Sequence, residues 1–234
     1  MSIVVPAVLP SSREDLHEKL DFFARIPAVS RIQIDVVDGR FAAPACWPYT
    51  APEELQTMVI QREMLPRLDC IEYEIDLMCL DAELAVSSWV ALGAARFTFH
   101  AESTSNLPLL LASARRRYGD DGILSFGLAL NIASDLALIE QCIDYIQYVQ
   151  CMGIAHIGRQ GQPLDQRVFE KVRVFHSRHP SIPLQVDGGI SLESAKKLLS
   201  LGVSNLVVGS HLLKAGDPTA AFVAFEELST PYGV

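Results

Sequence analysis

Short apolar runs alternate with longer amphipathic stretches along almost the whole chain. The runs have the length and the β-branched or aromatic content of buried strands. They cover residues 3–9, 31–37, 70–78, 95–101, 123–130, 146–152, 183–188 and 205–210. The stretches between them have helical spacing of apolar residues, over 11–26, 53–64, 82–93, 113–119, 136–145, 165–178 and 192–202. The pattern therefore predicts roughly eight consecutive strand–helix units.

Strict alternation of strands and helices implies a parallel sheet with right-handed crossovers. Such a sheet either stays open, as in doubly wound folds, or closes into a barrel. No GxGxxG sequence follows the first predicted strand, which weakens the doubly wound dinucleotide-binding fold. The 234 residues are close to the length of about 250 residues that a closed barrel needs. We therefore expect an α/β protein, a (β/α)8 TIM barrel forming a single domain over residues 1–234.

Composition and charge narrow the class of protein. The net charge of −9 argues against a nucleic-acid partner, because phosphate backbones require a basic surface. No apolar run has the roughly 18 residues of a membrane helix, and the N-terminus lacks the basic region of a signal peptide. The five cysteines are odd in number and lack CxxC spacing, as expected of reduced thiols. We expect a cytoplasmic protein without a membrane partner. Hydrophobic residues make up 50% of the sequence, which suggests subunit contacts in a homo-oligomer.

Two aspartates end predicted strands and precede turn glycines, Asp35 in IQIDVVDG and Asp187 in LQVDGG. In a closed barrel the carboxyl ends of all strands meet at one rim, where the active sites of such barrels lie. Two opposed carboxylates can remove a proton from one face of a carbon and return a proton to the other face. The pair therefore predicts the acid–base chemistry of an epimerase. Asp76 and His100 also fall at predicted strand ends and are expected at the same rim.

Glycine-rich turns follow the last three predicted strands. They contain Gly158, Arg159 and Gly161, then Gly188 and Gly189, then Gly209 and Ser210. Glycine lets the backbone approach a ligand closely, so that its N–H groups can bind an anion, and barrels often bind phosphate at the loops after strands 7 and 8. The alternative is that each glycine only forms a tight turn. Three such turns in this order favour a phosphate site.

Several segments together resemble the ribulose-phosphate 3-epimerase family, over residues 3 to 217. They are PAVL (6–9), IDVVDGRF (34–41), IDLM (75–78), FHAE (99–102), GLALN (127–131), VDGGI (186–190) and VGS (208–210). The resemblance implies a (β/α)8 barrel that acts on a phosphorylated ketose of the ribulose 5-phosphate or xylulose 5-phosphate type. It implies inversion of carbon 3 through an enediolate, with Asp35 and Asp187 as acid and base. It also implies an apolar cap of methionines around the reacting carbons, here Met78 and Met152, although core packing would explain both residues equally well.

The chain departs from the family pattern at the metal-binding positions. The family typically holds a divalent metal with two histidines and the two aspartates, but here Gln33 and Asp76 stand at the histidine positions. The family serine of the first strand is Ala7, and the usual N-P-G-F-G-G-Q loop is replaced by AHIGRQGQ at 155–162. The resemblance therefore leaves open whether a metal is bound and which one, and whether the altered loop still binds phosphate.

Two interpretations of the altered metal site remain open. Asp35, Asp76, Asp187 and Gln33 form an all-oxygen ligand set, which suits Mg²⁺, Mn²⁺ or Ca²⁺ better than Zn²⁺. The resemblance to the family adds a divalent metal such as Mn, Mg or Zn as the possible cofactor. Without a cation, three converging carboxylates repel, so at least one would have a raised pKa and hold a proton. In that case a protonated Asp76 could donate a hydrogen bond to the developing enediolate.

Three hypotheses for the function follow. The first is an epimerase of a small phosphorylated sugar, in which His100 contacts a substrate hydroxyl or orients a carboxylate. The second is a phosphosugar-binding protein without catalysis, although such a protein would not need two opposed carboxylates. The third is an aldolase or decarboxylase, which the sequence disfavours, because no lysine lies on a predicted strand and the second strand lacks the lysine of the related decarboxylases.

Overall fold

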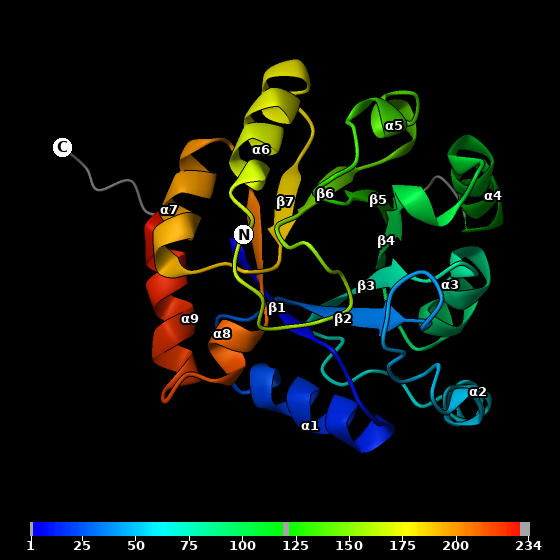
Figure 1. Cartoon of the computed structure of the whole chain (residues 1–234). Helices are drawn as coiled ribbons and strands as arrows, with labels where there is room; N and C mark the ends of the chain where they lie inside the picture. Colours follow the sequence, from blue (N-terminus) through cyan, green and yellow to red (C-terminus); the bar gives the residue numbers. More distant parts are fainter. Residues whose placement is uncertain (1, 119–121, 230–234) are drawn as a thin grey trace.

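The computed structural model describes residues 2–118 and 122–229, and within them eight parallel strands close into a barrel in sequence order. The strands are β1 (Val4–Val8), β2 (Arg31–Val37), β3 (Glu72–Met78), β4 (Arg96–His100), β5 (Ser125–Leu130), β6 (Tyr148–Met152), β7 (Leu184–Asp187) and β8 (Asn205–Val208). Pairing of β8 with β1 closes the ring. The predicted (β/α)8 TIM barrel is confirmed, and Figure 1 shows its helices surrounding the strands.

The helices follow the strands as the alternation predicts. They are α1 (Arg13–Ala24), α2 (Pro52–Gln61), α3 (Ala82–Ala91), α4 (Leu107–Tyr118), α5 (Ala137–Glu140), α6 (Arg167–Arg178), α7 (Leu192–Ser200), α8 (Ser210–Leu213) and α9 (Pro218–Glu226). No helix in the described parts of the chain is long and apolar enough to cross a membrane.

Some predicted boundaries were wrong. The helix expected over 136–145 is a single α-turn, α5, and a separate 3-10 turn over Ile143–Tyr145. Helix α4 begins at Leu107, six residues before the predicted start, and its expected end at Gly119 lies outside the described residues. Helix α9 was not predicted. Its N-cap is Asp217, whose side chain accepts a hydrogen bond from the Ala220 N–H, and Pro218 follows as a favourable first residue.

Side chains along each strand point alternately to the inside and the outside of the barrel, so the strands separate two environments. On β3, for example, Tyr73, Ile75 and Leu77 belong to the main apolar cluster between the barrel and its helices. The alternate residues Glu74 and Asp76 are buried polar groups. The same alternation puts buried polar residues on β2, β4, β6 and β7, namely Gln33, Asp35, Thr98, His100, Gln150, Gln185 and Asp187. The interior of this barrel is therefore largely polar, and its apolar core lies outside the strands.

Gly127 on β5 makes room for a large side chain in this interior. A Cβ atom at Gly127 would lie 2.3 Å from the Tyr148 ring, which is closer than any side chain tolerates. The Tyr148 hydroxyl lies 2.8 Å from the Thr98 hydroxyl and is buried with it. The absence of a side chain at Gly127 therefore leaves the space that the Tyr148 ring occupies inside the barrel.

Candidate active site

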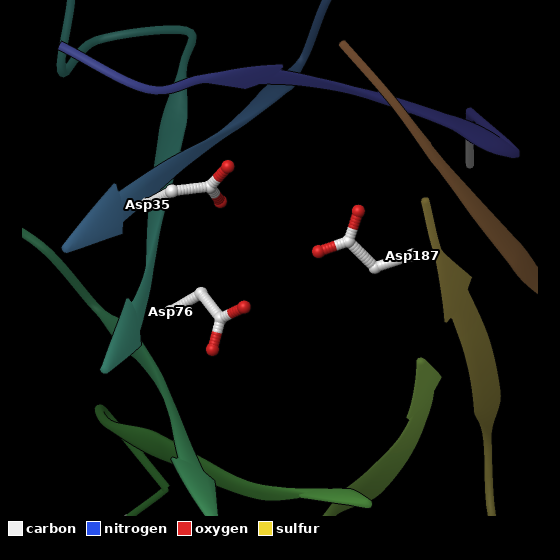
Figure 2. Close-up of side chains that lie close together, drawn as sticks. All are labelled: Asp35, Asp76 and Asp187. Atoms are coloured by element: carbon white, nitrogen blue, oxygen red, sulfur yellow. The ribbon is translucent and has the colours of Figure 1, made fainter. Parts of the chain in front are cut away.

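Three aspartate side chains converge at the carboxyl ends of the strands (Figure 2). Asp35 and Asp76 are register partners on the neighbouring strands β2 and β3, and Asp187 ends β7 and faces them. All three residues are buried, and one oxygen of each lies within 4.8 Å of those of the other two. The barrel rim thus brings together the acid–base pair and the third carboxylate expected from the sequence.

Gln33 joins the two candidate acid–base residues. Its Nε2 donates to Asp35 Oδ1 at 2.8 Å and to Asp187 Oδ2 at 3.0 Å. Gln33 is fully buried on β2, two residues before Asp35, so its side chain points to the same side of the sheet. One neutral amide group therefore holds both carboxylates at a fixed separation.

Asp76 is held from two other directions. His100 Nε2 lies 3.0 Å from Asp76 Oδ1, and Gln150 Nε2 donates to Asp76 Oδ2 at 3.0 Å. The His100 ring is fully buried and packs against the Phe41 ring at a centroid distance of 5.3 Å. Of the two roles considered for His100, this geometry fits the one that orients a carboxylate.

Burial and mutual repulsion change the proton affinity of this cluster. Desolvation and then the charge of Asp76 raise the pKa of Asp35 to about 8. Desolvation and then the charge of Asp35 raise the pKa of Asp187 well above its ordinary value. Burial alone would lower the pKa of His100, but the Asp76 carboxylate outweighs it and raises that pKa. The expected retained proton thus falls to Asp35 and Asp187, because both carboxyls of the pair bind a proton more readily than a free aspartate does.

The residues present fit a hard divalent cation. The three carboxylates supply only oxygen donors, as Mg²⁺, Mn²⁺ and Ca²⁺ prefer. Gln33 Oε1 is buried and accepts no hydrogen bond from any described residue, so the site also holds an amide oxygen without a partner. Asp35, Asp76 and Asp187 are placed to hold such an ion, whereas Gln33, the fourth donor expected from the sequence, turns its amide nitrogen toward these carboxylates.

A pocket of about 540 Å³ opens above the carboxylates. Asp35, Asp187, Met78 and Met152 line it, so both candidate acid–base residues and both methionines reach one space. Gln33, Asp76 and His100 do not line this pocket and are fully buried. The geometry therefore separates groups that can contact a ligand in the pocket from groups that support them.

The three glycine-rich turns form one end of this pocket. Its lining includes every residue proposed for the phosphate, namely Gly158, Arg159, Gly161, Gly188, Gly189, Gly209 and Ser210. Gly189 has a φ of +71°, and a Cβ atom there would lie 2.5 Å from the Leu164 backbone nitrogen. Only glycine fits where the turns after β6 and β7 press together in this way.

Arg159 lines the pocket and also forms a hydrogen bond to another loop. Its Nε donates to the Ala43 carbonyl oxygen at 2.9 Å, which ties the loop after β6 to the loop after β2. Its guanidinium therefore both lines the pocket and links two of the loops that surround it.

Sequence reasoning missed several residues of the site. Lys214 lines the pocket, and its Nζ lies 3.7 Å from the position of a Cβ atom at Gly161. It forms no ion pair with any residue in the described part of the chain. Ser191, the N-cap of α7, also lines the pocket. Lys214 has no sequence signal of its own, because only folding brings the chain after β8 beside the loop after β6, whereas SLESAKKL after the DGGI turn marks a helix start at Ser191.

Comparison with known proteins identifies relatives along nearly the whole chain. The model of the ribulose-phosphate 3 epimerase family matches residues 3–213. The chain is 24% identical over 221 residues to ribulose-phosphate 3-epimerase of Aquifex aeolicus, covering 93% of this chain and 92% of that protein. It is 25% identical over 217 residues to the cytoplasmic isoform from Oryza sativa subsp. japonica, covering 92% and 89%.

Solved structures share the fold at lower identity. A 3-hexulose-6-phosphate synthase aligns with a TM-score of 0.65 and 16% identity, covering 98% of this chain and all of that chain. The 3-keto-L-gulonate-6-phosphate decarboxylase of Vibrio cholerae aligns with a TM-score of 0.69 and 14% identity, covering 97% and 96%. These likenesses support the barrel, whereas the family match is specific to one group of barrels. This chain belongs to the ribulose-phosphate 3-epimerase family.

Proposed function

We propose that the protein is an epimerase that inverts carbon 3 of a phosphorylated ketopentose of the ribulose 5-phosphate or xylulose 5-phosphate type. The observation that carries this proposal is the pair Asp35 and Asp187, which line one pocket and share the Gln33 amide as a donor. The family match supports the same substrate class, because the relatives bear the name ribulose-phosphate 3-epimerase.

In the proposed reaction the ionised aspartate takes the proton from carbon 3. The electrons of the broken C–H bond form the C2–C3 double bond of an enediolate, and negative charge develops on the oxygen of carbon 2. The protonated aspartate then gives its proton to the opposite face of carbon 3. The pKa of Asp35, raised to about 8, and the raised pKa of Asp187 make each carboxyl a ready proton donor, and the exchange starts once one of the two has lost its proton.

The surrounding residues divide the remaining tasks. Met78 and Met152 offer an apolar border to the reacting carbons, and Gln33 holds the two carboxylates in place. The turns containing Gly188, Gly189 and Gly209 would bind the phosphate, and this remote contact would fix carbon 3 between the carboxylates. A divalent cation held by Asp35, Asp76 and Asp187 would supply positive charge to stabilise the enediolate oxygens.

Deuterium incorporation at carbon 3 of D-ribulose 5-phosphate in D₂O tests this proposal. We expect incorporation and epimerisation by the unmodified protein, and losses of at least about 100-fold in Asp35→Asn and in Asp187→Asn. Parallel reactions with EDTA and with added Mn²⁺, Mg²⁺ or Zn²⁺ report whether a cation contributes. The matched control is Asp38→Asn, which removes a carboxylate just after the end of β2, one that accepts hydrogen bonds from the N–H groups of Arg40, Phe41 and Leu80.

The outcome separates the proposal from its competitors. Phosphosugar binding without exchange in any arm would contradict the proposal and favour the non-catalytic binding protein. Exchange with another phosphosugar but not with ribulose 5-phosphate would retain the reaction and change the substrate. Loss of exchange in Asp38→Asn equal to that in Asp35→Asn would show that the assay reports loop integrity instead of acid–base chemistry.

A further inference from the structure

A second layer of polar side chains lies in the barrel interior next to the carboxylates. Gln150 Nε2 donates to Asp76 Oδ2 at 3.0 Å and lies 3.5 Å from Asp187 Oδ2. The same nitrogen lies 3.4 Å from Met152 Sδ. Gln150 is fully buried on β6, so its amide bridges carboxylates on two other strands, β3 and β7. This bridge accompanies the one that Gln33 makes between Asp35 and Asp187.

The orientation of the Gln150 amide is set by Gln185, on the side away from the aspartates. Gln185 Nε2 donates to Gln150 Oε1 at 2.7 Å and also to Glu74 Oε1. A glutamine side chain has one donor end and one acceptor end, so an oxygen fixed by Gln185 forces the nitrogen toward the aspartates. We call Glu74, Gln185 and Gln150 the amide relay.

The carboxylate of Glu74 gives the amide relay its direction. An ionised carboxylate only accepts hydrogen bonds, so Gln185 must present its nitrogen to Glu74. Gln185 Oε1 is buried and has no partner among the described residues, which shows that Glu74 and Gln150 both compete for the nitrogen end. Glu74 itself is held by Arg96 Nε at 3.1 Å and by the Thr98 hydroxyl at 3.0 Å.

The direction matters because of what the last amide faces. With its nitrogen toward Asp76 and Asp187, Gln150 supplies a donor to two neighbouring carboxyl groups. A reversed amide would put its oxygen beside both carboxylate oxygens, which repel it. Asp187 would then turn away from the position in which it faces Asp35 across the pocket.

We propose that Gln150 is a positioning residue for Asp187 and Asp76, and that Glu74 acts on the reaction by fixing the direction of the amide relay. This inference rests on the proposed function, because it assigns a role in holding the acid–base pair. Gln150 and Glu74 do not line the pocket, so neither contacts the substrate there.

A double-mutant cycle in the exchange assay tests the amide relay. Gln150→Met keeps the length of the side chain and removes the amide, and Glu74→Gln keeps the shape and removes the fixed acceptor. We expect each to lower kcat by roughly 10- to 100-fold with KM changed less than about 2-fold, as for other groups that orient catalytic residues. The double variant should be no slower than Gln150→Met alone, because Glu74 acts through Gln150.

Thr98→Val is the matched control. It removes another hydrogen bond to the same Glu74 oxygen but leaves Gln185 facing a carboxylate. We expect lower thermal stability with kcat close to that of the unmodified protein. Gln185→Met takes the place of Glu74→Gln if that variant does not fold, because it breaks the amide relay and leaves the Glu74–Arg96 pair intact.

The NMR signals of the Gln150 side-chain amide provide a readout that does not depend on enzymatic activity. They are assigned by their loss in Gln150→Met, and we expect slow hydrogen exchange in the unmodified protein and faster exchange in Glu74→Gln. Full kcat in Gln150→Met, additive losses in the double variant, or unchanged amide exchange would each overturn the inference. If the unmodified protein shows no exchange at carbon 3, the proposed function fails, and the amide signals still decide the direction of the relay.

Discussion

Gln33 shows how one side chain changes the balance of this site. The family resemblance puts a histidine at this position, whereas the amide here donates to both Asp35 and Asp187 and carries no charge. A neutral donor offsets less of the repulsion between two carboxylates than a cation would. The pair therefore retains a proton, and its pKa values depend on burial and on the neighbouring carboxylates.

The raised pKa of Asp35 predicts a pH dependence of stability. In the unfolded chain this carboxyl titrates near 3.8, and in the folded protein near 8. Between these values the folded protein holds a proton that the unfolded chain has released, so the contribution of Asp35 is complete below about pH 4 and is lost as pH rises toward 8. Asp35→Asn cannot titrate and should avoid this loss.

Thermal unfolding in EDTA at pH 5 and pH 8 measures the effect. We compare the free energy of unfolding of Asp35→Asn with that of the unmodified protein at each pH. From pH 5 to pH 8 this difference should change in favour of the variant by at least about 1 kcal/mol. For a protein of this size that corresponds to roughly 2–4 °C in Tm. A Tm difference that stays constant from pH 5 to pH 8 would contradict the raised pKa.

At the scale of elements, the turns after β6, β7 and β8 build one end of the pocket because they fold against each other. The Gly189 backbone lies against Pro163 and Leu164, so a turn after β7 and a loop after β6 share one packed contact. Arg159 adds a link from the loop after β6 to Ala43 in the loop after β2. The phosphate end therefore depends on contacts between loops as well as on the helix that follows β7.

Gly189→Ala should disturb this contact. The added methyl group meets backbone atoms at 2.5–2.8 Å and sits at a φ of +71°, so the loops must separate. We expect a loss of about 1–3 kcal/mol of stability and a KM for the phosphosugar raised at least about tenfold. Gly216→Ala is the control, because a Cβ atom there meets nothing within 4 Å. Equal KM values for the two variants would argue against this site for the phosphate.

At the scale of the whole molecule, an acidic protein must attract an anionic substrate. The net charge of −9 repels a phosphate dianion at long range, and two of the three buried aspartates, Asp35 and Asp187, line the pocket. Lys214 and Arg159 are cations that line the opposite end with its glycine turns. From this charge distribution we expect the phosphate beside the glycine turns and the neutral carbons near the carboxylates.

Lys214→Met tests this distribution. We expect KM to rise about 3- to 10-fold at low salt with little change in kcat, and the difference to shrink as ionic strength increases. Lys197→Met serves as the control, because that ammonium lies over the Phe169 ring and does not line the pocket. A salt-independent rise in KM, or the same rise in both variants, would exclude a specific role for Lys214.

The barrel and the meeting of Asp35 with Asp187 at one rim could be predicted because local signals specify them. Periodicity of two and of about 3.6 determined the order of strands and helices, and the positions of Asp35 and Asp187 before turn glycines placed both at one rim. Short elements were harder, since the single turn of α5 has too few residues for a period to appear. Helix α9 was also not predicted from the pattern, although Asp217 and Pro218 mark its start.

By itself, the sequence determined the alternation of elements, the rim at which the polar strand ends meet, and the family to which the chain belongs. Only the tertiary structure decided which polar groups touch. Gln150, Gln185 and Glu74 are separated by 35 to 111 positions and have no spacing that relates them, yet they form one directed chain of hydrogen bonds. Lys214 likewise reaches the pocket only because β8 lies beside β1 and β7 in the closed ring. Local pattern follows from neighbours in the chain, whereas contacts inside a barrel depend on its closure and register.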